Sequence, residues 1–383
     1  MPTTCGSPRI FGSNVPARTA TAVEPLEQAG AVILGKLHMT EFAFITHHPD
    51  TPLAQNPWAA ARSPGGSSSG SAIAAACGLA SATLGTDTAA SIRLPAAWCG
   101  AVGLKPTWGR VSRDGVFPLA ASFDHVGPIT RTVADATLLL HCIAGPDPRD
   151  PSTRRQGPPP AEPRPRDDFK GVRIGWDEEF VTMGVMPDVV AAVRAARDRM
   201  EALGAAIVPV ELPDLESTVK TFTDVFDVEM RFAHAALYPE RAADHGPLTR
   251  HALARFATRD PLVHVAGSIE ARAFRQRIDQ LFDEIDLLLC PVSTLTAPPQ
   301  VDHDTIIQIF GDDHRNIIRL TRLTSYWDLA ATPAISLPWG FDQDGLPLAV
   351  QLVTRIGTDE ALLSIAGRLE AEVPDRGRRP LFE

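Results

Sequence analysis

Apolar and polar positions follow helical spacing in several parts of the chain, and short apolar runs lie between them. Residues 20–30 place apolar side chains at helical spacing and end at Gly30, which predicts a helix with a glycine beyond its last turn. The next residues, 31–35, have the sequence AVILG and predict a short buried strand. A helix that leads into a strand is typical of α/β architecture.

Two further parts of the chain also predict helices and strands next to each other. Residues 71–79 are nearly all small and apolar, which predicts a buried helix, and residues 81–88 predict a strand that enters a loop. Farther on, residues 171–176 predict a strand, residues 187–204 an amphipathic helix with a glycine at its end, and residues 205–212 another strand. We therefore expect a second α/β passage.

The last part of the chain completes the predicted fold. Residues 214–283 predict mostly helix, and a closing helix is expected near 358–372. Three apolar runs predict strands, the last two as a hairpin: residues 286–293, 333–340 and 346–355. Residues 146–168 are dense in proline and charge, so we expect them to cross the surface. The prediction is one α/β domain over residues 1–383, a central mixed β-sheet covered by helices.

Composition and charge narrow the classes of function. The net charge is -10, and the arginines form no basic stripe, so we expect no nucleic-acid partner. No stretch reaches the ~20 apolar residues that a membrane span needs, and the first residues lack the features of a signal peptide. The five cysteines are widely separated and include no C-x-x-C pair, which favours a reducing cytoplasm. We expect a cytoplasmic protein. Its composition leaves both a monomer and a homo-oligomer open.

The first candidate for chemistry is the stretch GGSSSGS, residues 65–71. As a flexible linker it is short, and it joins two apolar segments. As a nucleophile elbow, residues 66–70 match G-x-S-x-G with Ser68 at the centre, but residues 62–64 before them do not predict the required strand. The third interpretation is a shaped catalytic loop at the N-terminus of a helix. The loop has no G-K-[ST] ending and so is not a phosphate-binding P-loop.

The segment that follows supports the third interpretation. Residues 85–136 read GTDTAASIRLPAAWCGAVGLKPTWGRVSRDGVFPLAASFDHVGPITRTVADA. Together with the serine loop, this segment resembles the signature of the amidase signature family, whose members hydrolyse or transfer amide groups with a serine nucleophile. Ser91 lies 24 residues after Ser67, as the family pattern requires, and the resemblance extends over nearly the whole chain. It implies the amidase-signature fold, a small-molecule amide as substrate, and no metal or organic cofactor.

The resemblance also implies a role for individual residues. A serine hydroxyl is a weak nucleophile at neutral pH and needs a base. By resemblance Ser91 is the nucleophile and Ser67 is the bridging serine, which follows a cis peptide bond and relays a proton to a neutral lysine. The oxyanion of the tetrahedral intermediate needs hydrogen-bond donors, and by resemblance these are the backbone N–H groups of Thr88, Ala89, Ala90 and Ser91. Four residues are expected to support the loops: Gly66, Ser68, Asp87 and Arg93. Asp87 and Arg93 form an ion pair in this interpretation; the alternative is that both are solvated.

Two features depart from the family pattern. Ala89 and Ala90 stand where the family has glycines, so a positive φ at either position would strain the backbone. The family's lysine lies upstream of the segment that MPTTCGSPRIFG resembles, which implies that the N-terminal part with the catalytic lysine is missing here. Lys36 is the lysine that precedes Ser67 and is a candidate substitute, whereas Lys105 matches a position without a role in proton transfer. We therefore expect weak or absent hydrolysis.

Other reactive residue types favour plainer interpretations. His47 and His48 are adjacent, so their side chains do not converge on one metal ion. A second group of histidines and aspartates lies at residues 302–304 and 312–314, and we expect no metal site there either. Cys99 lies among apolar residues, which predicts a small core residue rather than a reactive thiol.

These observations predict an amidase that hydrolyses a carbon–nitrogen amide bond through a Ser91 acyl-enzyme. One alternative is the glutaminase (A) subunit of a tRNA-dependent amidotransferase, which would need partner subunits. Another is a catalytically silent amidase-like protein, which the absent lysine favours. A hydrolase that uses Ser68 is the remaining alternative.

Overall fold

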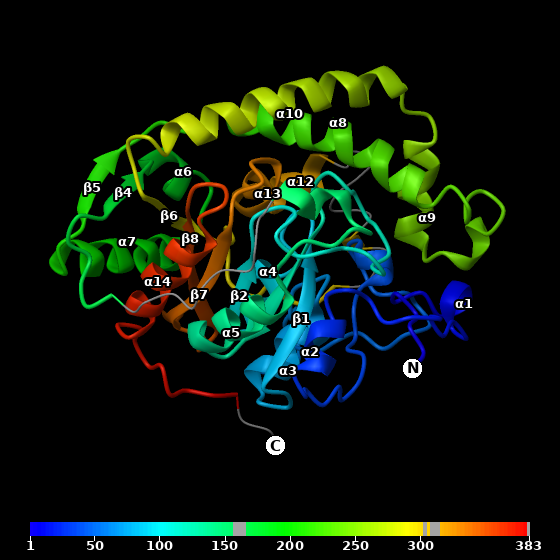
Figure 1. Cartoon of the computed structure of the whole chain (residues 1–383), viewed down its shortest axis with the longest axis horizontal. Coiled ribbons are helices and arrows are strands. Elements are labelled where there is room, and N and C mark those ends of the chain that lie inside the picture. Colours follow the sequence, from blue (N-terminus) through cyan, green and yellow to red (C-terminus); the bar gives the residue numbers. More distant parts are fainter. Residues whose placement is uncertain (156–165, 302–304, 307–314, 381–383) are drawn as a thin grey trace.

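The central element of the fold is one mixed β-sheet. The computed structural model describes residues 1–155, 166–301, 305–306 and 315–380. Eight strands in these residues have the order β1-β3-β2-β7-β8-β6-β4-β5 (Figure 1). Strand β4 pairs in parallel with β5 and β6, and all other neighbours are antiparallel. The strands are β1 (Ala82–Asp87), β2 (Val102–Lys105), β3 (His125–Thr130), β4 (Arg173–Trp176), β5 (Ala206–Pro209), β6 (Leu287–Pro291), β7 (Ala334–Phe341) and β8 (Pro347–Val353). The predicted α/β fold with a mixed sheet is confirmed.

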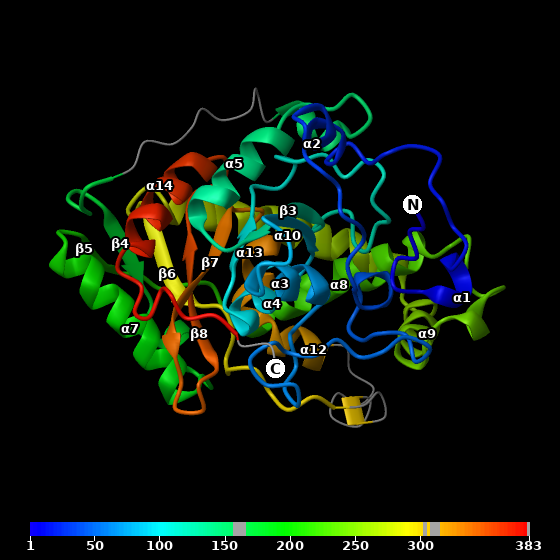
Figure 2. The same ribbon diagram turned by 90° about the horizontal axis from the view of Figure 1, so that it is seen from below.

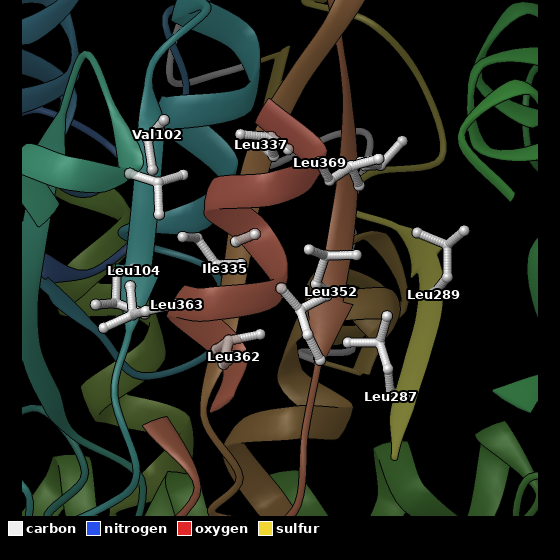
Figure 3. Close-up of a cluster of buried hydrophobic side chains, with 14 of the residues drawn as sticks. Val102, Leu104, Leu287, Leu289, Ile335, Leu337, Leu352, Leu362, Leu363 and Leu369 are labelled. Atoms are coloured by element: carbon white, nitrogen blue, oxygen red, sulfur yellow. The ribbon is translucent and has the colours of Figure 1, made fainter. Parts of the chain in front are cut away.

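Three helices cover one face of the sheet: α5 (Val133–Ile143), α7 (Pro187–Ala202) and α14 (Asp359–Glu370). Helix α14 lies beside α5 in both views (Figures 1 and 2). Leucines of α14 pack on apolar side chains that alternate strand positions direct to this face, including Leu104, Ile335 and Leu352 (Figure 3). Burial of this apolar layer fixes the register of the strands.

The opposite face carries the helices that matter for chemistry. Helices α3 (Ser69–Ala76), α4 (Arg93–Cys99) and α13 (Arg322–Leu329) pack there. Helix α8 (Leu215–Ala233) packs against α13, and α10 (Pro261–Leu281) runs alongside α8 (Figure 1). The other helices with described bounds are α1 (Pro8–Phe11), α2 (Glu24–Gln28), α6 (Glu178–Thr182), α9 (Pro247–Phe256), α12 (Arg315–Leu320) and the short 3₁₀ turns η1 (Glu41–Ala43), η2 (Pro151–Arg155) and η3 (Ala242–Asp244).

The predicted elements agree with this arrangement apart from one strand and some boundaries. The helix expected over 20–30 is confined to α2, and Gly30 has the positive φ, 86°, expected after a helix end. Of the surface connection 146–168, residues 156–165 lie outside the described part of the chain. None of the described helices has the length and apolar content that crossing a bilayer requires.

The strand predicted at 31–35 is wrong. These residues have no assigned secondary structure, no described strand or bridge pairs with them, and Val32 and Leu34 are 82% and 74% exposed. An apolar run forms a buried strand only where a neighbouring strand accepts its hydrogen bonds. Such a neighbour is a property of the tertiary structure, which the run itself does not encode.

Candidate active site

Two serines of the GGSSSGS stretch bind the backbone of β1. The Ser68 hydroxyl donates to the carbonyl of Thr86 at 3.3 Å and accepts from the Thr86 N–H at 3.2 Å. The Ser71 hydroxyl donates to the carbonyl of Leu84 at 2.8 Å. Since β1 is a terminal strand of the sheet, these bonds satisfy edge groups that would otherwise lack partners. Ser68 is thus a supporting residue, and no strand leads into it as a nucleophile elbow requires.

Ser67 differs from its neighbours in having an unused hydroxyl. Ser67 is 2% exposed, and its Oγ has no hydrogen-bond partner among the described residues. Ser69, by contrast, donates to the carbonyl of Gly65 at 2.6 Å. The Gly66–Ser67 peptide bond is cis, as the resemblance implied. Of the four hydroxyls at residues 67, 68, 69 and 71, that of Ser67 is therefore the one available for chemistry.

Ser91 lies in the loop between β1 and α4, and the fold brings this loop to the serine stretch. The N–H of Ser68 donates to the carbonyl of Ser91 at 3.2 Å. Ser91 is partly exposed, so a substrate can reach it. Within the described residues no hydrogen bond joins the Ser67 and Ser91 hydroxyls. The two predicted serines are thus neighbours through the backbone, with the proton relay between them not formed.

The backbone N–H groups of residues 88–91 are a set of unused donors. None of them donates to an acceptor within the described residues. The Thr88 hydroxyl donates to Asp124 Oδ1 at 2.6 Å, which anchors the start of the loop. Neither Ala89 nor Ala90 has a positive φ, so the strain considered for these alanines does not arise. Consecutive free N–H groups beside a hydroxyl are the arrangement that an oxyanion requires.

Asp87 and Arg93 fix the two ends of this loop. Arg93 Nε and Nη2 donate to the two Asp87 oxygens at 2.9 and 3.0 Å, and both side chains are fully buried. Asp87 also accepts from the backbone N–H groups of Ile92 and Arg93 at 3.1 and 3.3 Å. Burial alone would raise the pKa of Asp87, but the Arg93 charge and hydrogen bonds outweigh it and lower that pKa. The predicted ion pair is confirmed, and the solvated alternative is wrong.

The sequence interpretation missed the buried polar residues around this pair. Asp328, Gln351, Lys105 and His125 are at most 3% exposed and lie on α13, β8, β2 and β3. Burial lowers the pKa of Lys105 to about 8, and burial and the Lys105 charge hold the pKa of His125 well below its usual value. A signal for two of them was present in the sequence, since Gln351 and Asp328 interrupt the apolar runs LAVQLV and WDLAA.

None of the four lysines reaches Ser67 in the described part of the chain. Lys36, the candidate substitute base, has an exposed side chain. Lys105 donates to the carbonyl of Thr332, and Lys170 and Lys220 pair with aspartates at 3.2 and 2.5 Å. The structure therefore brings together Ser67, Ser91 and the candidate oxyanion loop, but no amine base.

The structure places two of the remaining candidates, Cys99 and His47, in the interior. Cys99 is fully buried, and burial raises the pKa of its thiol. His47 is buried and stacks on His38. The described residues contain no group of three or more side chains suited to hold a metal ion, and the group at 302–304 and 312–314 lies outside them.

A cavity of about 210 Å³ adjoins the loop at Thr86 and Thr88. Apolar side chains line much of it, among them Ala43, Val116, Phe117, Pro118, Leu119 and Val126. Two of its arginines are paired with acids, Arg113 with Asp150 at 3.3 Å and Arg149 with Asp114 at 3.4 Å. A cavity of this kind suits a small uncharged group.

Comparison with known proteins gives consistent matches. A family model described as Amidase matches residues 1–363. The glutamyl-tRNA(Gln) amidotransferase (A) subunit of Synechococcus sp. (strain RCC307) is 37% identical over 99% of this chain and 82% of that protein. The crystal structure of the glutamyl-tRNA(Gln) amidotransferase (A) subunit from Thermotoga maritima has a TM-score of 0.84 at 30% identity, covering 100% of this chain and 82% of that one. The structure of 6-aminohexanoate cyclic dimer hydrolase complexed with substrate has a TM-score of 0.85 at 27% identity, covering 99% of this chain and 83% of that one.

Proposed function

Because this chain belongs to the amidase family, we propose that it hydrolyses the carbon–nitrogen bond of an amide through an acyl-enzyme on Ser91. The observation that carries the proposal is the row of free N–H groups at residues 88–91, beside a partly exposed serine and a second serine with an unused hydroxyl. The substrate is a small amide, and the paired charges of the adjoining cavity support an uncharged one. The five free cysteines support a location in the reducing cytoplasm.

In the proposed reaction the Ser91 Oγ attacks the amide carbonyl carbon and loses its proton toward Ser67 Oγ. The carbonyl oxygen becomes an oxyanion, which accepts hydrogen bonds from the N–H groups of residues 88–91. The carbon–nitrogen bond then breaks as Ser67 passes a proton on to the leaving amine nitrogen, and an ester joins the acyl group to Ser91. Water hydrolyses that ester, releases the acid and restores the serine.

Slow turnover is expected from the surroundings of Ser67. A relay serine passes a proton on only when a base accepts it, and no lysine of the described chain contacts the Ser67 hydroxyl. The nucleophile therefore lacks the activation that the mechanism needs.

Hydrolysis of a simple aryl amide tests the proposal. We expect slow release of the amine by the 383-residue protein, none by Ser91→Ala, and retained release by Ser68→Ala. Turnover that survives Ser91→Ala would contradict the assignment of the nucleophile. Turnover as fast as that of ordinary amidases, still abolished by Ser91→Ala, would contradict the expected lack of a base.

A glutaminase subunit of an amidotransferase is the second candidate, favoured by the 37% identity to the Synechococcus protein of that name. Such relatives also leave the expected lack of a nucleic-acid partner unsupported, because their name includes glutamyl-tRNA. Release of ammonia from glutamine that depends on co-purified partner subunits would favour this candidate. Release of amines from neutral amides by the isolated chain would favour the simple amidase.

A further inference from the structure

A second carboxylate, distant in sequence, holds the arginine that supports the Ser91 loop. Arg93 Nη2 donates to Asp328 Oδ2 at 2.5 Å, and both side chains are 0% exposed. Asp328 lies on α13, 235 positions after Arg93. The orientation of the guanidinium group is therefore set by α13 as well as by Asp87 at the end of β1.

Every N–H donor of the Arg93 side chain has a defined acceptor. Nε and one Nη2 bond go to Asp87, and the second Nη2 bond goes to Asp328. Nη1 donates to the Thr324 carbonyl at 3.0 Å and to Gln351 Oε1 at 2.9 Å. A guanidinium group has five such donors, and all five are used here. Loss of one acceptor leaves a buried donor unsatisfied, so the group must shift to find another.

His125, a buried residue of the sheet, lies beside Asp328. His125 Nδ1 lies 3.4 Å from Asp328 Oδ1 and 3.1 Å from the carbonyl of Asp87. The Lys105 ammonium donates to the Thr332 carbonyl and lies 3.3 Å from His125 Nε2. The contact with the Asp87 carbonyl fixes the tautomer of His125, with the proton on Nδ1. Asp328 Oδ1 has no hydrogen-bond partner among the described residues, so the bond from Arg93 Nη2 to Asp328 Oδ2 is the contact that carries the inference.

We propose that Asp328 is a positioning residue for the Ser91 loop, acting through Arg93. The inference rests on the proposed function of Ser91. Arg93 orients Asp87, and Asp87 binds the N–H groups at positions 92 and 93, where the loop ends. A shift of Arg93 is thereby passed to the donors at 88–91, whose distance from the oxyanion decides how well they stabilise it.

The test compares three variants of the full chain by the rate at which a fluorophosphonate probe labels Ser91. Asp328→Asn keeps a side-chain oxygen that can accept from Arg93 Nη2. We expect labelling within about threefold of the unmodified protein. Asp328→Ala removes the acceptor and is expected to slow labelling by about tenfold or more, as misplaced catalytic groups do.

Asp224→Ala is the matched control. Asp224 is also a buried aspartate paired with an arginine, Arg259 at 3.0 Å, and with Lys220 at 2.5 Å; it lies on α8, and neither pair in the described structure includes a residue of the Ser91 loop. We expect it to lower the urea midpoint as Asp328→Ala does while labelling stays unchanged. If both alanine variants slow the labelling of Ser91 equally, the role of Asp328 is purely structural and the inference is overturned. If Asp328→Ala does not slow labelling, Asp328 has no role at the loop and the inference is likewise overturned.

A second readout separates this inference from the proposed function. If the unmodified protein is not labelled at Ser91, the proposed nucleophile fails, and amide hydrogen exchange of the peptide that contains residues 88–93 tests the positioning role. Faster exchange in Asp328→Ala than in Asp224→Ala supports that role. Equal exchange in the two variants overturns it.

Discussion

Acidification from about pH 7.5 to about pH 4 is expected to destabilise the protein through two buried histidines. His234, which follows α8, and His245 lie with ring centroids 5.6 Å apart and pack on Phe42 at 4.8 and 5.6 Å. In each ring Nδ1 bonds to the carbonyl four residues earlier, at 2.9 and 3.0 Å. Neither Nε2 has a hydrogen-bond partner in the described structure. A proton added at either Nε2 would therefore be buried without an acceptor.

The magnitude follows from the pKa of His234. Burial lowers it from 6.5 to about 4, with Arg231 and His245 as further unfavourable neighbours. Burial also lowers the pKa of His245, against the opposing effect of Glu41 and Asp244. The unfolded chain thus takes up a proton at a higher pH than the folded one. Stability from this source is complete above about pH 6.5 and falls as the pH drops to about 4, by ~3 kcal/mol for His234.

Urea unfolding followed by tryptophan fluorescence at several pH values measures this loss. His234→Gln, which does not titrate, is expected to flatten the pH dependence of the unfolding free energy by ~3 kcal/mol between about pH 6.5 and about pH 4. The unmodified protein, measured in the same buffers, is the reference. Parallel curves for the two proteins would refute the reasoning, since carboxylates would then account for the whole acid effect.

Three substitutions near the loop give further tests. Arg93→Met leaves Asp87 buried without its partner and is expected to lower the free energy of unfolding, measured by urea titration, by ~3–5 kcal/mol. It is also expected to abolish the labelling of Ser91 by a fluorophosphonate, measured by mass spectrometry. Ser67→Ala removes an unsatisfied hydroxyl, so the melting temperature is expected to stay level or rise while labelling of Ser91 slows; a clear fall in melting temperature would show that the hydroxyl has a structural partner. Lys36→Ala is expected to change neither labelling nor stability, and lost labelling would make Lys36 the base.

The sequence predicted the parts of the site that are local. Ser67 and Ser91 were assigned by resemblance to a family signature, and the Asp87–Arg93 pair was expected beside them; the structure places the serine stretch next to Ser91 and forms the pair. Asp328 could not be assigned in this way, because its contact with Arg93 spans 235 positions and depends on how α13 packs on the sheet. The strand predicted at 31–35 failed for the same physical reason: strand formation depends on a pairing neighbour, and the run alone does not supply one.

The most direct test of the central claim is to treat the 383-residue protein with a fluorophosphonate and locate the adduct by peptide mass spectrometry. An adduct on Ser91, lost in Ser91→Ala and kept in Lys36→Ala, is the predicted result. An adduct on Ser68 or Ser67, or no adduct in protein that unfolds cooperatively in urea, would contradict the assignment of Ser91 as the nucleophile of an amidase.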